Sequence, residues 1–105
     1  MTAMSDSGRF SSVDYEIHGS VQGVFFRQYT LDKAQSTGVV GWVMNTEAGT
    51  VKGTFQGTKF QVDEMKHFVS KVGSPMSQIT RAVFTNEREL VQKDYERFSV
   101  SGGDW

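Results

Sequence analysis

The residues whose types and spacing could perform chemistry lie between Gly19 and Arg27. This stretch reads Gly-Ser-Val-Gln-Gly-Val-Phe-Phe-Arg and separates a predicted strand from a predicted helix. Glycine allows the backbone to bend so that successive N–H groups point toward one position. Arg27 adds a planar guanidinium that is always charged and matches the oxygens of a phosphate-like anion. The pattern therefore predicts a small cradle for one phosphate-like group.

The helix predicted after this loop strengthens the interpretation. Phe26, Thr30 and Ala34 recur at helical spacing, and Gly38 follows the last turn, where a left-handed residue belongs. Arg27 thus falls in the first turn, where the helix macrodipole is positive and a cation alone is unfavourable. A bound anion reverses that sign and also meets the N–H groups that have no partner within the helix.

Other interpretations of the loop are open at this point. A strand-to-helix turn with a surface arginine would have the same residues. A Walker A loop is excluded, because no Gly-Lys-Ser/Thr follows the glycines. The spacing from Val21 to Arg27 equals that of the Cys-x5-Arg loop of thiol phosphatases, but valine cannot form a phosphocysteine intermediate.

Two long motifs together resemble the signatures of the acylphosphatase family. Residues 19–27 resemble the first signature, and residues 41–51 (Gly-Trp-Val-Met-Asn-Thr-Glu-Ala-Gly-Thr-Val), closing at Gly57, resemble the second. The resemblance extends from about Val13 to Val100. It implies a hydrolase of small acyl phosphates that uses no metal and no cofactor, with inorganic phosphate as product and inhibitor.

The resemblance also implies the roles of the two catalytic residues: Arg27 binds the phosphate and Asn45 orients the attacking water. An acyl phosphate is a mixed anhydride with a good leaving group, so holding phosphate, spreading its charge and aiming a water suffice. Asn45 ends an apolar strand and offers both a donor and an acceptor, although asparagine is also an ordinary turn residue. The main-chain amides expected to hold the phosphate are those of Gln22, Gly23, Val24, Phe25 and Phe26.

Three further residues are expected to hold the site in shape without contacting the substrate themselves. Gly19 begins the bent loop, while Thr46 and Thr50 flank Asn45 and could hold it. No role is assigned to the Phe25 side chain, because the resemblance leaves that position variable. The histidines and carboxylates match no catalytic position of the family, so a phosphate oxygen is the hypothetical acceptor of the water proton.

Hydrophobic periodicity predicts the elements that position these residues. The alternation from Val13 to His18 indicates a strand, and a capping-box spacing at Thr58–Gln61 opens a second helix with one apolar stripe. The remaining expectations are a hairpin (Val39–Met44 and Thr50–Gly57), a strand (Ile79–Thr85), a loop (Asn86–Lys93), a last strand (Tyr95–Val100), and a helical stripe of Val62, Met65, Phe68, Val69 and Val72. This βαββαβ order predicts an α+β, ferredoxin-like sandwich: an antiparallel sheet with two helices on one face, and a short extra C-terminal strand.

Length and composition limit the class of protein. The 105 residues suit one domain, expected over residues 13–100, with a flexible N-terminal tail (1–12) and a C-terminal tail (101–105). There is no cysteine, no apolar run of membrane-spanning length and no signal-peptide pattern at the start. The net charge of -1 gives no support to nucleic-acid binding. We expect a cytoplasmic monomer that acts on a small molecule, without nucleic-acid or membrane partners.

Two competing functions share this fold. One is a non-catalytic module that binds an anion or senses a phosphorylated effector. The other is an RNA-binding sheet, which needs aromatic and basic side chains on the exposed sheet face. The face expected to be exposed on the third strand offers neither stacking nor much charge, because it consists of Thr50, Lys52, Thr54 and Gln56.

Overall fold

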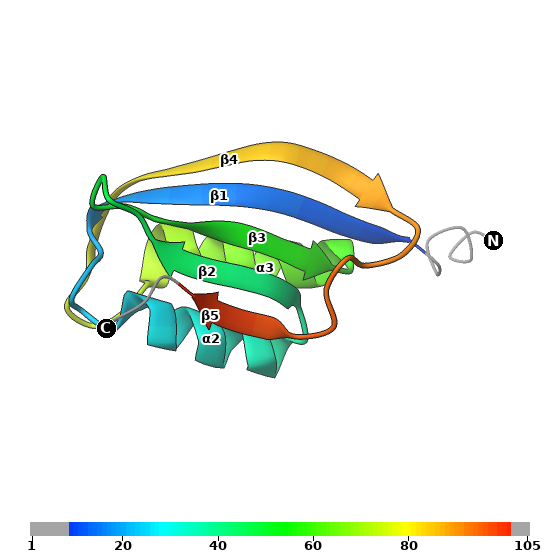
Figure 1. The fold of residues 1–105 in the computed structure, drawn as a ribbon, viewed down its shortest axis with the longest axis horizontal. Coiled ribbons are helices and arrows are strands. Elements are labelled where there is room, and N and C mark those ends of the chain that lie inside the picture. The colour runs from blue at the N-terminus through cyan, green and yellow to red at the C-terminus, as the bar shows by residue number, and fades with distance from the viewer. Residues whose placement is uncertain (1–8, 102–105) are drawn as a thin grey trace.

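A computed structural model describes residues 9–101, so residues 1–8 and 102–105 of the two expected tails lie outside the described residues. The elements are β1 (Phe10–Ser20), α2 (Phe26–Thr37), β2 (Val40–Asn45), β3 (Val51–Gly57), α3 (Lys59–His67), the π-turn η1 (Phe68–Val72), β4 (Gln78–Leu90) and β5 (Phe98–Ser101) (Figure 1). The order matches the order predicted from the sequence.

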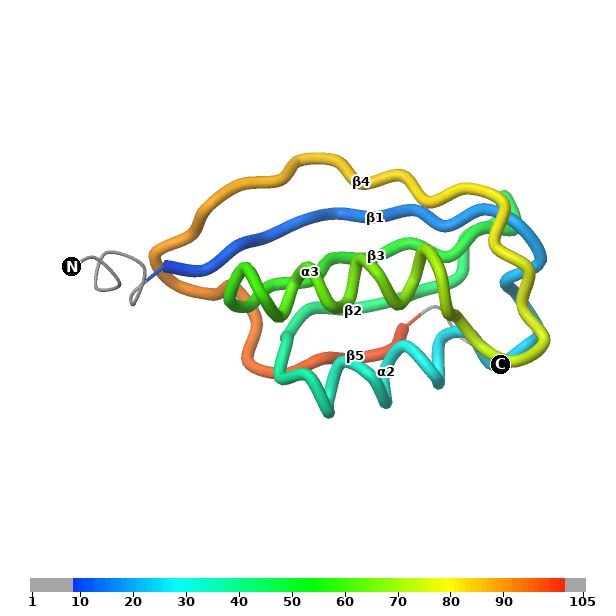
Figure 2. The backbone as a smooth tube through the Cα atoms, turned by 180° about the vertical axis from the view of Figure 1, so that it is seen from behind, coloured from blue at the N-terminus to red at the C-terminus, as the bar shows by residue number. Residues whose placement is uncertain are grey.

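The five strands form one sheet in the order β4-β1-β3-β2-β5. Strands β1 to β4 pair antiparallel, and the short β5 lies parallel to β2, which makes the whole sheet mixed. The chain leaves β4 near the end of the molecule where β2 begins, so it enters β5 in the direction of β2 (Figure 1). Both helices cover the same face of the sheet, as seen from behind in Figure 2. This arrangement confirms the ferredoxin-like α+β fold.

The core lies between that face and the helices. Val13, Tyr15 and Ile17 alternate inward along β1 and are buried, as the period-2 pattern predicted. The ring of Tyr15 stacks on Phe55 with centroids 4.1 Å apart, and its hydroxyl donates a 2.9 Å hydrogen bond to the Trp42 carbonyl. Burial raises the pKa of Tyr15 well above its usual value.

The second helix begins as predicted but ends differently. The Thr58 hydroxyl accepts from the Gln61 N–H (3.1 Å), and the Gln61 side chain accepts from the Thr58 N–H (2.9 Å), which forms the capping box. At the other end η1 replaces the α-helical turn, and Gly73 N–H donates to the Phe68 carbonyl. The wider turn rotates Val72 out of the apolar stripe. Val72 is 54% exposed, so its predicted burial was wrong.

Two strands are longer than the sequence pattern predicted. β1 begins at Phe10 rather than Val13, and β4 continues through the Asn86–Leu90 segment that was expected to be a loop. Phe10 pairs with Leu90 at the far end of this ladder. The prediction failed because β4 is an edge strand whose charged residues face solvent, which removes the apolar alternation. The last strand also begins later than expected, at Phe98.

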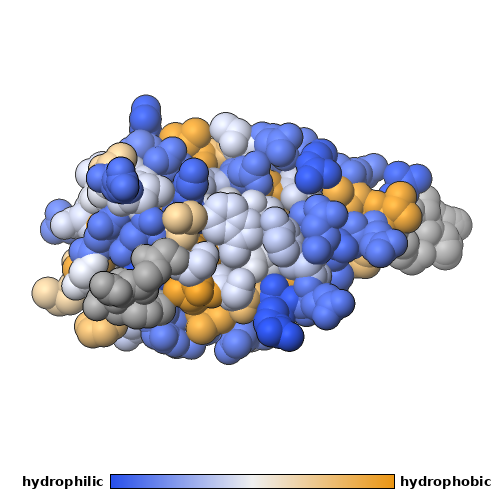
Figure 3. Space-filling model, viewed as in Figure 1, coloured by the Kyte–Doolittle hydropathy of each residue, from blue (hydrophilic) through white to orange (hydrophobic). Residues whose placement is uncertain are grey.

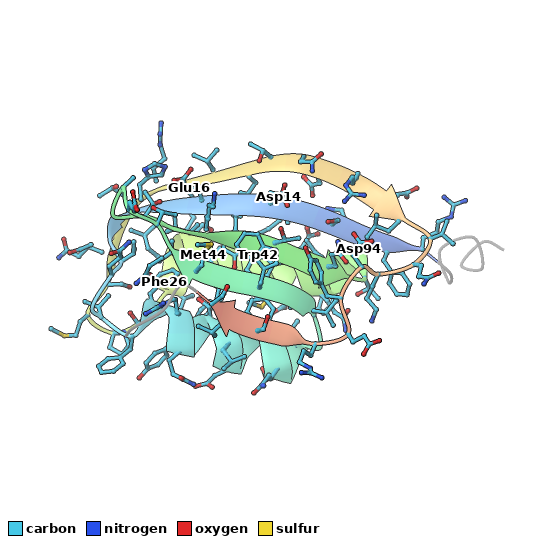
Figure 4. All side chains as sticks on the ribbon, in the orientation of Figure 1. Asp14, Glu16, Phe26, Trp42, Met44 and Asp94 are labelled. Atoms are coloured by element: carbon cyan, nitrogen blue, oxygen red, sulfur yellow. The ribbon has the colours of Figure 1, made fainter. Side chains whose placement is uncertain are left out.

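The polar face of β3 is not the exposed surface that the sequence suggested. The Thr54 hydroxyl donates to Asp14 (2.7 Å), and the Gln56 side chain donates to Asp94 (2.9 Å). Of the four predicted positions, Lys52 is exposed, whereas Thr50, Thr54 and Gln56 are buried. In Figure 4 Asp14, Glu16 and Trp42 lie on this side of the sheet, opposite the helices. Several polar side chains on this face are therefore hydrogen-bonded to one another, and Figure 3 shows hydrophilic side chains mainly around its edges, with less polar ones near its middle.

Candidate active site

The loop between β1 and α2 bends through left-handed backbone at two residues. Gly23 has φ 76° and Phe25 has φ 63°, after which α2 begins. Gly19, at the end of β1, has φ 130° and marks a register shift against β4. A Cβ at Gly19 would collide with the main-chain oxygen of Gln78, so this glycine is required by the close approach of the two strands.

Arg27 lies in the first turn of α2, as predicted, and is only 4% exposed. Its Nη1 donates a 3.3 Å hydrogen bond to the main-chain carbonyl of Ser101, the last residue of β5. A buried guanidinium is expensive unless its donors are matched, so the end of β5 contributes to holding this charge. No spacing pattern in the sequence indicates this contact, because Arg27 and Ser101 are 74 residues apart and meet only once β5 has paired with β2.

A cavity of about 160 Å³ brings together the two residues predicted to be catalytic. Arg27 reaches it from α2 and Asn45 from the end of β2, and Figure 1 shows these two ends at the same side of the molecule. The side chains and backbone that line it belong to Val21, Gly23, Phe25, Phe26, Arg27 and Asn45. Of the residues whose amides were expected to hold phosphate, Gln22 and Val24 lie in the loop but outside this lining.

The carboxamide oxygen of Asn45 has no hydrogen-bond partner among the described residues. Its Oδ1 is buried and accepts no hydrogen bond from residues 9–101. An unsatisfied buried carbonyl costs about 1–3 kcal/mol, so such groups in native proteins usually serve a purpose. Asn45 lines the cavity, so its carboxamide lies beside the space that a bound molecule would occupy.

The Gln22 side chain connects the loop to the β2–β3 turn. Its Nε2 donates to the Thr46 carbonyl (2.8 Å) and to the Thr50 carbonyl (2.9 Å). Thr46 directly follows Asn45, so this side chain ties the loop beside Arg27 to the backbone that carries Asn45. The sequence analysis assigned Gln22 only a main-chain role, because no spacing rule distinguishes the two uses of one residue.

Thr46 and Thr50 form a hydrogen-bond chain inside the same turn. Their hydroxyls lie 2.6 Å apart, and the Thr50 hydroxyl donates to Glu16 Oε2 at 2.6 Å. Because the Thr50 hydroxyl donates its one proton to Glu16, the Thr46 hydroxyl must be the donor in the bond between the two threonines. The two threonines were expected to hold Asn45, and they do stiffen the turn next to it, but neither donates to its Oδ1.

Within residues 9–101, no group of three or more His, Cys, Asp or Glu side chains is placed to hold a metal ion. His18 is half-buried on the polar side of β1, and His67 is exposed. In the part of the chain that the structure describes, no helix is long and apolar enough to cross a membrane.

The fold and the cavity together define a small ferredoxin-like protein with an arginine-bearing site at a helix N-terminus. A sequence model of the acylphosphatase family matches residues 13–100. The chain is 52% identical over 97 residues to the Homo sapiens protein Acylphosphatase-2, an alignment that covers 92% of this chain and 98% of the human protein. The chain belongs to the acylphosphatase family.

Solved structures agree with this assignment. An acylphosphatase from Coxiella burnetii superimposes with a TM-score of 0.77 at 28% sequence identity, covering 96% of this chain and all of the other (100%). The acylphosphatase from Bacillus subtilis gives a TM-score of 0.78 at 29% identity, covering 87% and 98% of the two chains.

Proposed function

We propose that this protein hydrolyses the carboxyl–phosphate bond of small acyl phosphates, releasing a carboxylate and inorganic phosphate. Membership of the acylphosphatase family supports this activity. The assignment of the activity to Arg27 and Asn45 is supported by their position: they come from α2 and β2 and line one cavity.

Arg27 and the loop bind the phosphoryl group in this mechanism. The guanidinium offers a fork of donors, and the main-chain amides from Gln22 to Phe26, at the start of α2, supply further N–H groups. Charge–charge attraction is stronger where water is excluded, and Arg27 is nearly buried. Donors fixed in place before the reaction stabilise the charge that spreads over the phosphoryl oxygens in the transition state.

Asn45 orients the attacking water. Its Oδ1 accepts a hydrogen bond from the water, whose oxygen then forms a bond to phosphorus opposite the leaving carboxylate. The bond between phosphorus and the acyl oxygen breaks, the carboxylate leaves with the electron pair, and a phosphoryl oxygen takes the water proton. Among residues 9–101, no histidine or carboxylate lines the cavity, which favours the substrate itself as proton acceptor.

The test is hydrolysis of benzoyl phosphate in the presence of a chelator. The unmodified protein should turn over at the same rate with and without the chelator, and Asn45→Ala should lose turnover while inorganic phosphate still protects it against heating. A protein that phosphate protects but that hydrolyses nothing would instead be the non-catalytic anion-binding module. Activity that disappears with the chelator would contradict the metal-free mechanism.

We also propose that inorganic phosphate inhibits as the product and that the chain acts as a monomer in the cytoplasm. Product inhibition follows from a site that binds the phosphoryl group through Arg27. Competitive kinetics with phosphate, light scattering and cell fractionation test these three statements in turn.

A further inference from the structure

Phe25 stands apart from the other residues that line the active-site cavity. Val21 and Phe26, the other large apolar residues of the lining, are each 1% exposed and belong to the core. Phe25 is 68% exposed, so most of its ring lies at the surface where the cavity opens. Figure 3 shows apolar side chains gathered at the end of the molecule where this loop lies.

The backbone at Phe25 makes the exposed ring more unexpected. The residue adopts φ 63° and ψ 23° directly before α2, a left-handed conformation that an aromatic residue rarely takes and glycine takes freely. Neither burial in the core nor backbone preference explains a phenylalanine here. Its position against the cavity offers an explanation, because a bound molecule would cover the ring.

Two of the residues that line the cavity carry polar side chains. Arg27 and Asn45 supply its charged and amide groups, and the remaining lining side chains are apolar. In the proposed function the phosphoryl group lies against Arg27, so the acyl group of the substrate must extend toward the opening. An apolar acyl group would then lie against the ring of Phe25.

We propose that Phe25 determines substrate specificity and favours acyl phosphates with an aromatic acyl group over those with a small one. This inference rests on the proposed function. Two aromatic rings that pack together exclude water from the side on which each ring faces the other, and they gain a further attraction from their quadrupoles. We expect the ring to favour benzoyl over acetyl phosphate by about tenfold, equivalent to about 1.4 kcal/mol.

The experiment compares kcat/KM for benzoyl phosphate and acetyl phosphate in the unmodified protein, Phe25→Gly and Phe25→Asn. Both substitutions suit left-handed backbone, so the loop can keep its shape while the ring is lost. The ratio of the two kcat/KM values should fall about tenfold in both variants. Phe25→Tyr, which keeps the ring, should retain the ratio. Phe60→Ala removes an equally exposed ring that does not line the cavity and should leave the ratio unchanged.

The possible outcomes are distinct. A ratio that stays constant while both kcat/KM values fall would show that Phe25 acts only through the shape of the loop, and would overturn the proposal. A ratio that falls equally in Phe60→Ala would overturn it as well. If the unmodified protein hydrolyses neither substrate, the proposed function itself is refuted, together with this inference.

Discussion

The side-chain amide of Gln22 donates a hydrogen bond to the main-chain carbonyl of Thr46 at 2.8 Å, from the β1–α2 loop to the β2–β3 turn. The same nitrogen donates a second hydrogen bond to the main-chain carbonyl of Thr50 (2.9 Å), so the side chain contacts the turn at two points. This side chain therefore joins the loop proposed to hold the phosphate to the turn that follows Asn45. Water attack in line with the leaving group depends on the relative position of the loop and Asn45.

Replacing Gln22 with alanine should therefore lower kcat. The change removes two hydrogen bonds, each contributing about 0.5–1.5 kcal/mol, so the free energy of unfolding should fall by about 1–3 kcal/mol. Misplacement of Asn45 relative to the phosphate should reduce kcat by about 10- to 100-fold. Urea unfolding and benzoyl phosphate kinetics measure the two effects.

The matched control for Gln22→Ala is Gln28→Ala, which removes an exposed glutamine from α2 whose side chain donates to Asp32 on the same helix. It should leave kcat and stability nearly unchanged. If Gln22→Ala unfolds as the unmodified protein does and keeps its kcat, the link between loop and turn has no mechanical role.

Arg27→Lys should weaken phosphate binding although it keeps the positive charge. Lysine presents a point charge in place of a planar fork, so it cannot donate to two phosphoryl oxygens in the same geometry. Arg27→Ala should cost more, about 1.5–3 kcal/mol of phosphate binding, which raises the inhibition constant of phosphate by about 10- to 150-fold. Inhibition by inorganic phosphate and isothermal titration would measure both variants. Arg81→Ala, at an exposed position of β4, is the control, and equal losses in Arg81→Ala and Arg27→Ala would contradict a local role.

The features that the sequence predicted well are those with strong local signals. The capping box at Thr58, the left-handed Gly38 after α2 and the inward alternation of β1 depend on neighbours within a few residues, and the structure has all three. Arg27 and Asn45 were predicted from two motifs, and their placement on one cavity follows from the antiparallel arrangement of the elements between them.

The features that the sequence did not predict depend on contacts across the fold. Thr54 and Gln56 looked solvent-facing by their alternation, but partners on β1 and in the loop after β4 cover them. The strand residues after Asn86 carry charges because β4 is an edge, and charge is also typical of loops. The side-chain bonds of Gln22 join segments distant in sequence, and no periodicity reports such pairs.

Gly53→Ala should destabilise the protein without touching the active site. A Cβ at Gly53 would collide with the main-chain oxygen of Trp42 and with the hydroxyl of Tyr15. Overpacking of this kind costs about 1–3 kcal/mol. Gly49→Ala is the comparison, because a Cβ there meets open space and only the left-handed backbone opposes it, at about 1–2 kcal/mol. Thermal unfolding measures the loss of stability in each variant. A Gly53→Ala protein as stable as the unmodified one would show that the strand can shift to admit the methyl group.

The stability of the protein should fall at alkaline pH through Tyr15. Burial raises the pKa of Tyr15, so the folded state keeps its phenol protonated where the unfolded chain, with a pKa of about 10, releases the proton. Above about pH 10 the unfolded state binds fewer protons, and the free energy of unfolding falls by up to about 1.4 kcal/mol per pH unit.

Tyr15→Phe removes this titration together with the hydrogen bond to Trp42. At neutral pH the variant should be less stable by about 0.5–1.5 kcal/mol. Because only the unmodified protein loses stability through Tyr15 as the pH rises above 10, the difference between the two should shrink and then reverse. Urea unfolding at pH 8, 10 and 11, taken at matched ionic strength, measures that difference. If it stays constant over this range, the phenol ionises as readily in the folded protein as in the unfolded chain, and burial of Tyr15 has no part in alkaline unfolding.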